Sequence, residues 1–219
     1  MQKRILILVA IKMEADAIAR AFRVRAPRGA GAVELPSRMP AELRVVGMGA
    51  IRMPDLSGQP YAGLIMAGLA GGLDPKWVVG DVVVDSRMTW RASRIRFERT
   101  MFHTAEEAVT SPAEKAELFK RTGAGVVEME NAQVRAAAAA YSIPFLGLRA
   151  ISDSADEAVD PAVLKFVDPY GSVRVNEVVS EMFRHPSIAM KLRRLSKTSA
   201  IALGSLAEGV KEVINGVGV

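Results

Sequence analysis

The stretch GVVEMENAQVRAAAAAYSIPFLGLRAISDSAD, residues 125–156, decides the fold of this chain. Its alanine-rich middle, residues 131–141, predicts a helix, and the apolar run at residues 144–150 predicts a buried strand. Glu128 and Glu130 end the short apolar run that precedes the helix. A strand, a helix and a second strand in this order are typical of an α/β protein.

Two further carboxylates, Asp153 and Asp156, follow the second strand. In a parallel sheet the ends of the two strands lie side by side, so we expect acids that are far apart in sequence to meet at one edge. Such a group of carboxylates at strand ends predicts an active site.

The rest of the chain continues the alternation between strands and helices. Strands are predicted at residues 5–11, 42–46, 61–67 and 81–85, and helices at residues 13–22, 112–121, 173–183 and 187–214. Residues 26–40 predict a loop, and residues 68–80 are expected to separate two strands. The expected fold class is α/β: a three-layer α/β/α domain with a mostly parallel, twisted central sheet, spanning residues 1–219 as a single domain.

The composition fits one enzyme domain without a bound cofactor. The chain has 219 residues, 50% of them hydrophobic, which is enough to bury a large aliphatic core. It has no cysteine and only two histidines, His103 and His185, so a thiolate metal site is excluded and a histidine-rich one is not expected. We therefore expect a mechanism without metal or cofactor.

The amino-terminal residues MQKRILILVAIKMEAD contain an apolar run that could be mistaken for a signal peptide. Lys12, Glu14 and Asp16 interrupt this run, and no small-residue cleavage site follows it. No segment reaches the length of apolar run that spans a bilayer. We expect a cytoplasmic protein.

The formal net charge of +5 and the pI near 9.7 raise the question of a nucleic-acid partner. The excess of 29 Lys and Arg over 24 Asp and Glu is mild, and aromatic residues for base stacking make up only 5% of the chain. Many basic residues lie at 87–99 and 184–197, where a solvated face explains them better than a nucleic-acid site. No nucleic-acid partner is expected.

Five segments match a known family in the same order: AIKMEADAI at residues 10–18, AGLAGGLDP at 67–75, VGDVVV at 79–84, VEMEN at 127–131 and IPFLGLRAISDSAD at 143–156. On these segments the chain resembles the nucleoside phosphorylase and nucleosidase superfamily. The greatest similarity is to methylthioadenosine/S-adenosylhomocysteine nucleosidases and to the enzymes of hopanoid lipid synthesis that remove adenine from adenosylhopane. The resemblance covers most of residues 4–157.

The resemblance implies that Asp153 is the acid of the reaction. When the N-ribosidic bond breaks, the purine leaves with developing negative charge, so a protonated carboxyl at N7 lowers the barrier. Burial at the end of an apolar strand would help Asp153 to keep its proton. The alternative for Asp153 is a cap on the following turn, and Asp156 is expected to shape the loop that holds Asp153.

The resemblance assigns Glu130 and Met129 to the ribose. One ionised carboxylate can accept hydrogen bonds from both the 2′ and 3′ hydroxyls, and Met129 matches the methionine that packs under the sugar. The alternative for Glu130 is an ordinary acid in the first turn of a helix, where the helix dipole favours it. Glu128 is a further candidate for substrate binding, but its direction depends on where strand gives way to helix.

Glu14 and Arg149 match two residues of the family that lie near the attacking water. Glu14 aligns with the glutamate that orients or deprotonates this water, and Arg149 with an arginine near the water and the ribose. Taken alone, such a glutamate is more often an acid on a helix surface than a base. Gly71 and Gly72 would let the backbone approach the sugar and the base.

Several residues depart from the family pattern. Leu69 stands where many relatives carry Ser or Thr, and the stretch 49–67 is too short and too rich in Pro and Gly for the helix usually found there. Phe102 and Val109 are the candidates for the base pocket, although neither matches the usual stacking aromatic. Asn131 replaces a small residue, with an effect that the sequence leaves open.

We expect this protein to hydrolyse the N-glycosidic bond of a small-molecule purine nucleoside of the adenosine type, releasing adenine, and to form a homo-oligomer, a dimer. The missing helix weakens the prediction of a standard dimer. A second possibility is phosphorolysis, for which Arg52 and the loop 47–49 could bind phosphate. A third is a non-catalytic nucleoside-binding protein, but Glu14, Glu130 and Asp153 together argue against it.

The closing segment, residues 183–214, could bring the protein to a membrane surface. Apolar residues recur along it at helical spacing, and its amino-terminal half carries Lys191, Arg193, Arg194 and Lys197. Peripheral contact with anionic lipid would suit a lipid-linked nucleoside. Packing on the protein itself, with the cations in water, is the commoner arrangement and is favoured.

Overall fold

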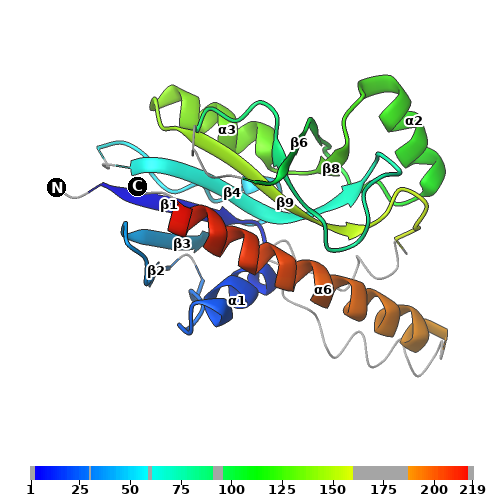
Figure 1. The fold of residues 1–219 in the computed structure, drawn as a ribbon, viewed down its shortest axis with the longest axis horizontal. Coiled ribbons are helices and arrows are strands. Elements are labelled where there is room, and N and C mark those ends of the chain that lie inside the picture. Colours follow the sequence, from blue (N-terminus) through cyan, green and yellow to red (C-terminus); the bar gives the residue numbers. More distant parts are fainter. Residues whose placement is uncertain (1–2, 30, 59–60, 91–95, 160–186, 217–219) are drawn as a thin grey trace.

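The computed structural model describes residues 3–29, 31–58, 61–90, 96–159 and 187–216, with side chains from residue 197 onward in the last range. Within these ranges a sheet of nine strands carries helices on both faces (Figure 1). The helices are α1 (Lys12–Ala21), α2 (Pro112–Thr122), α3 (Asn131–Ala140) and α6 (Ser187–Gly216), and a short 3₁₀ helix, η1, spans Met48–Ala50.

The sheet is mixed but mostly parallel. Its strands are β1 (Arg4–Val9), β2 (Ala32–Leu35), β3 (Ala41–Val45), β4 (Tyr61–Gly72), β5 (Val82–Asp85), β6 (Glu98–Thr100), β7 (Phe102–Thr104), β8 (Val126–Glu128) and β9 (Phe145–Asp153). The order is β2-β3-β1-β4-β9-β5-β6, while β8 pairs with both β4 and β7. Among the described strands five pairings are parallel and three antiparallel, which confirms the predicted sheet.

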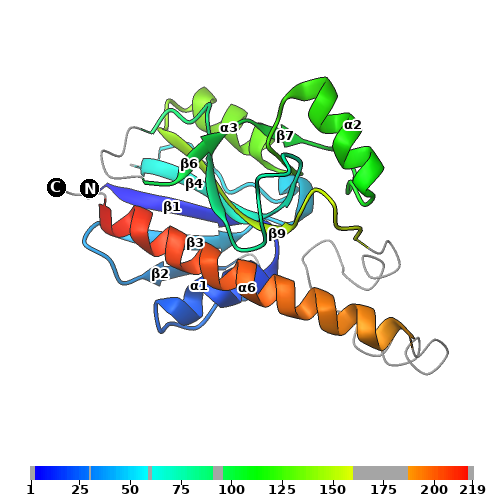
Figure 2. The ribbon, with the colours of Figure 1, turned by 45° about the vertical axis from the view of Figure 1, so that its right-hand side comes forward.

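Alternation along β1 shows how the sheet separates two layers. Ile5, Ile7 and Val9 belong to the core that lies against α1 and α6, whereas Leu6 and Leu8 belong to the core that includes α3. Successive side chains of a strand point to opposite faces, so a run that is apolar throughout is buried on both sides. Figures 1 and 2 show α1 and α6 together on one face and α3 on the other, as expected for a three-layer domain.

The long closing helix packs on its own domain over its second half. Side chains of α6 in that half enter the core beneath the sheet: Ala202, Leu206, Val210, Val213 and Ile214. The predicted helix 173–183 lies outside the described residues, as do the side chains of Lys191, Arg193 and Arg194. None of the described helices is long and apolar enough to pass through a membrane.

Three segments of the chain can be compared with their predicted local structure. The predicted loop 26–40 contains strand β2, which pairs antiparallel with β3 at the sheet edge. The glycine-rich residues 68–72 continue strand β4 and do not form a turn, because β9 pairs with them over most of their length. The helix expected to be missing after residue 49 is indeed absent from the described residues 49–58, which hold only the end of η1 and turns.

The strands that carry the acids are not neighbours, in contrast to the prediction. Strand β4 lies between them: Gly71 pairs with Val127 of β8 on one side and with Asp153 of β9 on the other. The pairing of β8 with β4 is antiparallel, so the acids meet around the end of β4 and not at two adjacent parallel ends. The turn after β8 then directs the chain into α3.

Candidate active site

Glu14 is a buried carboxylate held by three backbone amides. It lies in the first turn of α1 and is 3% exposed. Its Oε2 accepts hydrogen bonds from the amides of Ala10 and Ile11, both at 3.0 Å, and its Oε1 accepts one from the amide of Leu69 at 2.8 Å. The pKa of Glu14 is raised to about 7: burial is the main cause and the charge of Glu130 contributes, while the Leu69 amide works in the opposite direction.

Strand β4 makes room for this carboxylate at a glycine. A Cβ atom at Gly68 would lie 2.9 Å from Oε1 of Glu14 and 3.4 Å from Nη1 of Arg149. The side chain of Leu69 packs against the core next to α1 and α6, so its backbone amide, and not its side chain, contributes to the site. The segment therefore accommodates Glu14 by lacking side chains on one face.

Arg149 is the buried cation at the centre of the site. The residue, on β9, is fully buried, and its Nη2 lies 2.6 Å from Glu128 and 3.5 Å from Glu130. Its Nη1 donates to the carbonyl oxygens of Met66 at 3.0 Å and Leu148 at 3.3 Å. Burial works against the charge of Arg149, but the surrounding carboxylates outweigh it and raise its pKa.

Glu128 is bonded to the start of α3, to Thr104 and to Arg149. One of its oxygens accepts from the amides of Glu130 at 2.9 Å and Asn131 at 2.6 Å, as well as from Arg149. The other accepts from the hydroxyl of Thr104. These bonds satisfy the first amides of α3, as an N-terminal cap does, and hold Arg149 in place. These contacts give Glu128 a supporting role, and its predicted contact with a substrate stays a prediction.

Glu130 is held less completely than Glu128. Its Oε1 accepts a hydrogen bond from the amide of Gly49 at 3.0 Å, while its Oε2 makes a long contact of 3.5 Å with Arg149. Burial raises the pKa of Glu130, Arg149 lowers it and Glu128 raises it again, with a net increase. Met129 beside it is partly exposed. Glu130 keeps acceptor capacity for two hydroxyl groups.

Asp153 ends β9 and is paired with a lysine. Its side chain is 15% exposed, and its Oδ2 lies 2.5 Å from Nζ of Lys115, which is fully buried. The hydroxyl of Ser152 lies 2.6 Å from its Oδ1. A Cβ atom at Gly71 would lie 3.1 Å from Oδ2, and one at Gly72 would lie 3.3 Å from the Asp153 carbonyl oxygen. Asp153 is thus a partly exposed, paired carboxylate, in contrast to the expected lone buried acid.

The loop after Asp153 is shaped by its own side chains. The hydroxyl of Ser154 donates to the exposed Asp156 at 2.6 Å, which fits the predicted role of Asp156 in shaping this loop. The amide of Val159 donates to the carbonyl oxygen of Thr110 at 2.8 Å and so ties the loop to the segment before α2.

The candidates for the base pocket differ in accessibility. Phe102 is 1% exposed and packs with Trp77 and Val126 in the core, so it is not available to a base, and this prediction is wrong. Val109 is partly buried next to the small core that includes Leu118. It lies one residue from the contact between Thr110 and the loop after Asp153, so it stays a candidate.

Asn131 anchors the start of α3. Its Nδ2 donates to Oδ2 of Asp85 at 2.6 Å, and Asp85 also pairs with Nε of Arg87 at 3.2 Å. A Cβ atom at Gly147 would overlap with the Asn131 amide. The sequence left the effect of Asn131 open, and it missed Asp85, Thr104 and Lys115. A lysine in the first turn of a helix, where the dipole disfavours it, is the only signal that could have pointed to Lys115.

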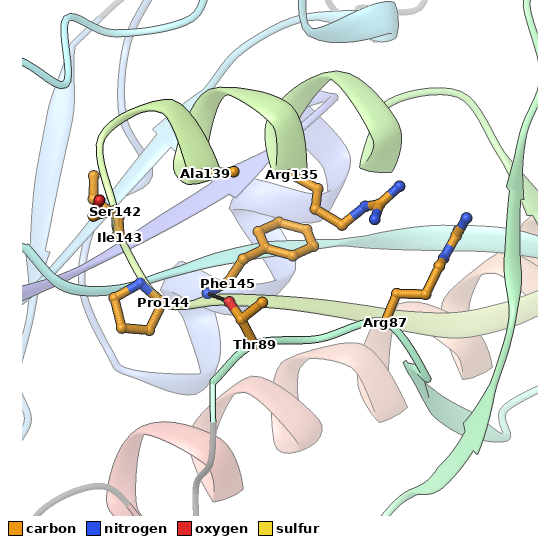
Figure 3. A pocket seen from close by; sticks show the side chains of 8 residues that line it. All are labelled: Arg87, Thr89, Arg135, Ala139, Ser142, Ile143, Pro144 and Phe145. Atoms are coloured by element: carbon orange, nitrogen blue, oxygen red, sulfur yellow. Dashed lines mark hydrogen bonds between the residues drawn. The ribbon is translucent and has the colours of Figure 1, made fainter.

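Two cavities lie away from these carboxylates. The first, of about 380 Å³, sits at the opposite end of β9, and its lining residues are Arg87, Thr89, Arg135, Ala139, Ser142, Ile143, Pro144 and Phe145 (Figure 3). The second, of about 590 Å³, runs between α1 and α6. No three His, Asp or Glu side chains within the described ranges are placed to hold a metal ion.

Comparison with known proteins supports the resemblance. The model of the phosphorylase superfamily matches residues 85–184. A search of curated protein sequences finds no match.

The fold is shared with solved nucleosidases. The 5′-methylthioadenosine/S-adenosylhomocysteine nucleosidase of Helicobacter pylori has a TM-score of 0.69 at 16% identity, with 97% of each chain covered. The enzyme of that name from Neisseria meningitidis, in complex with methylthio-immucillin-A, has a TM-score of 0.66 at 20% identity, with 98% of this chain and all of that chain covered. Futalosine hydrolase of Helicobacter pylori has a TM-score of 0.63 at 16% identity, with 97% of each chain covered.

Proposed function

Starting from the phosphorylase-superfamily match and the shared fold, we propose that this protein is a nucleosidase that hydrolyses the N-glycosidic bond of an adenosine-type nucleoside and releases adenine. The observation that carries the proposal is Glu14, a buried carboxylate with a pKa of about 7, close to Glu130 and Arg149. A general base works best when its pKa lies near the working pH. Such a group is needed to take a proton from water at neutral pH.

Each step has a residue of suitable chemistry. Water attacks C1′ as the bond from C1′ to N9 breaks, and Glu14 takes the proton that the water loses. Asp153 gives a proton to N7, so that the electron pair of the broken bond leaves on a neutral purine. The products are adenine and the free 5-substituted ribose, and the proton gained by Glu14 replaces the one lost by Asp153.

Glu130 is suited to hold the ribose. The contact of its Oε2 with Arg149 is long, at 3.5 Å, which leaves room for hydrogen bonds from the 2′ and 3′ hydroxyls. Met129, partly exposed beside it, would pack under the sugar. Glu128 and Arg149 serve the site by fixing the start of α3 and the position of Glu130.

The charge of the site favours water over phosphate as the nucleophile. Glu14, Glu128 and Glu130 surround one guanidinium, that of Arg149, so a phosphate dianion would meet more negative than positive charge. The amide of Gly49, a donor that a phosphate site would use, is already bonded to Glu130. Phosphorolysis would require this bond to break and a further cation to move in.

The adenosine-type substrate is supported by the likeness to nucleosidases whose complexes hold methylthioadenosine or its analogues, for example the methylthio-immucillin-A complex from Neisseria meningitidis. The 5′ substituent of this protein's substrate could be methylthio, homocysteinyl or a large lipid. Likeness to futalosine hydrolase extends the range of 5′ groups that should be tried.

A panel of adenosine derivatives, assayed for free adenine with and without phosphate and with a chelator, tests the proposal. We expect adenine release that is indifferent to both additions, and loss of release in Glu14→Gln, with Glu117→Gln on the exposed face of α2 as the control. Strict dependence on phosphate with a sugar phosphate as product would identify a phosphorylase. Tight binding of nucleosides without any cleavage would identify a binding protein.

A further inference from the structure

Lys115 has an unusual environment for a lysine. It lies in the first turn of α2, and its whole side chain is buried. Its ammonium donates three hydrogen bonds: to Oδ2 of Asp153 at 2.5 Å, to the carbonyl oxygen of Ser154 at 2.7 Å and to that of Glu157 at 2.9 Å. An ammonium has three N–H groups, so all of its donors are used.

Helix α2 does not need this lysine. Its amino terminus is capped by Ser111 and Glu114, which bond each other's backbone amides. A cation in the first turn opposes the helix dipole, and burial of an ammonium is costly unless it is paired. The position of Lys115 is therefore explained by the segment it binds, residues 153–157, and not by the helix that carries it.

The three acceptors include the carboxylate that the proposed reaction uses as its acid. Two of the bonds tie down the loop behind Asp153, and the third, which is the shortest, is charge-assisted and fixes the carboxyl group itself. No donor of Lys115 remains for a substrate, so it cannot act by binding one. It can act on the reaction through the Asp153 carboxylate and through the loop that carries it.

We infer that Lys115 is a positioning residue for Asp153, an inference that rests on the proposed nucleosidase function. When the O–H bond of Asp153 breaks and N7 gains the proton, a carboxylate remains, and Lys115 stabilises it at the moment it forms. The same ammonium holds the loop so that the carboxyl group keeps one direction toward the base.

The test compares Lys115→Met in the wild-type and in the Asp153→Asn background. Methionine is neutral and of similar length, so it removes the charge with little loss of packing. Because Lys115 acts through Asp153, Lys115→Met should lower kcat for adenine release by about 10- to 100-fold in the wild type and by no more than about twofold in Asp153→Asn. KM should change little. Equal losses in both backgrounds would mean a structural role and would overturn the inference.

A second substrate distinguishes a loss of activity through misfolding from a loss of acid catalysis. A 4-nitrophenyl riboside with the preferred 5′ group has a leaving group that needs no protonation, so Lys115→Met should cleave it at close to the wild-type rate. Lys115→Arg, which keeps the charge, should recover part of the adenine release. A matching loss on both substrates in a variant that melts normally would overturn the inference. Absence of adenine release by the wild type would instead reject the proposed function, and the role of Lys115 with it.

Discussion

At the scale of the residue, the carboxylates of the site differ in their surroundings. Glu128 accepts hydrogen bonds from the first amides of α3, from Thr104 and from Arg149, which suits a supporting role. Glu14 is also held by amides, but burial raises its pKa to about 7, which makes its charge depend on pH in the neutral range. A glutamate thus supports the site at position 128, while the glutamate at position 14 is the proposed base.

The pH dependence of activity should report Glu14. Below a pH of about 7 Glu14 is protonated and cannot take a proton from water, and above it the carboxylate is ionised and can. We therefore expect kcat/KM for adenine release to rise through about pH 7. Glu14→Gln should lose this activity at every pH, whereas Glu117→Gln should keep the wild-type profile. A wild-type profile that does not change across this range would contradict the role of Glu14 as base.

Asp153→Asn tests the acid. The amide is nearly isosteric but has no acidic proton to give to N7, so kcat should fall by roughly 10²-fold or more with little change in KM. Asp156→Asn is the matched control, because it lies in the same loop, is exposed and keeps an oxygen for the Ser154 hydroxyl. Turnover of Asp153→Asn close to that of the wild type would remove this residue from the mechanism.

At the scale of the element, strand β4 gives the site its space. It is the central strand between β1 and β9, and its last residues extend past the end of β1, where Val9 pairs with Ala67. Gly68 faces Glu14 and Gly71 faces Asp153 along this extension. A Cβ atom at Gly68 would lie 2.9 Å from Glu14, and one at Gly71 would lie 3.1 Å from Asp153, so either would press on a carboxylate that the proposed reaction requires.

Gly68→Ala should lower activity without unfolding the protein. The new methyl group would lie 2.9 Å from Oε1 of Glu14 and displace a carboxylate that three amides hold in place. A shift of this order at a catalytic group costs about 10- to 100-fold in kcat. Gly204→Ala on α6, where a Cβ atom meets nothing within 4 Å, is the control and should be fully active. Full activity of Gly68→Ala would show that Glu14 tolerates displacement.

At the scale of the whole molecule, α6 closes the domain on the face that carries α1. The second half of α6 buries most of its apolar side chains in the core, although Ile201 is 57% exposed. In its first half Lys197 is exposed, while the side chains of Lys191, Arg193 and Arg194 lie outside the described residues, so the membrane contact and the dimer both stay predictions.

Co-sedimentation with vesicles tests the membrane contact. Because the apolar face of the described half of α6 is used inside the domain, we expect no binding to neutral or anionic vesicles at low salt. Binding that needs anionic lipid, weakens with salt and disappears in a variant with Arg193→Glu and Arg194→Glu would contradict this and favour a lipid-linked substrate.

Most of the helices and strands, and the candidate site residues, could be predicted from the sequence. Continuous apolar runs predicted β1, the first part of β4 and β9, and helical spacing predicted α1, α2, α3 and α6 close to their observed bounds. Glu14, Glu130 and Arg149 were identified by resemblance and do meet in one buried cluster. Such features can be predicted from the sequence because strand period, helix period and motif spacing are local properties of the chain.

Which side chains form hydrogen bonds, ion pairs and core contacts with one another could be seen only in the folded protein. The role of Glu128 depends on the amides and the guanidinium around it. Phe102 is a core residue because β7 pairs with β8, which places Phe102 beside Val126. The pairing of Lys115 with Asp153, 38 residues away along the chain, requires α2 to pack beside the end of β9. Long-range pairings of this kind follow from strand order and helix packing, which no local pattern encodes.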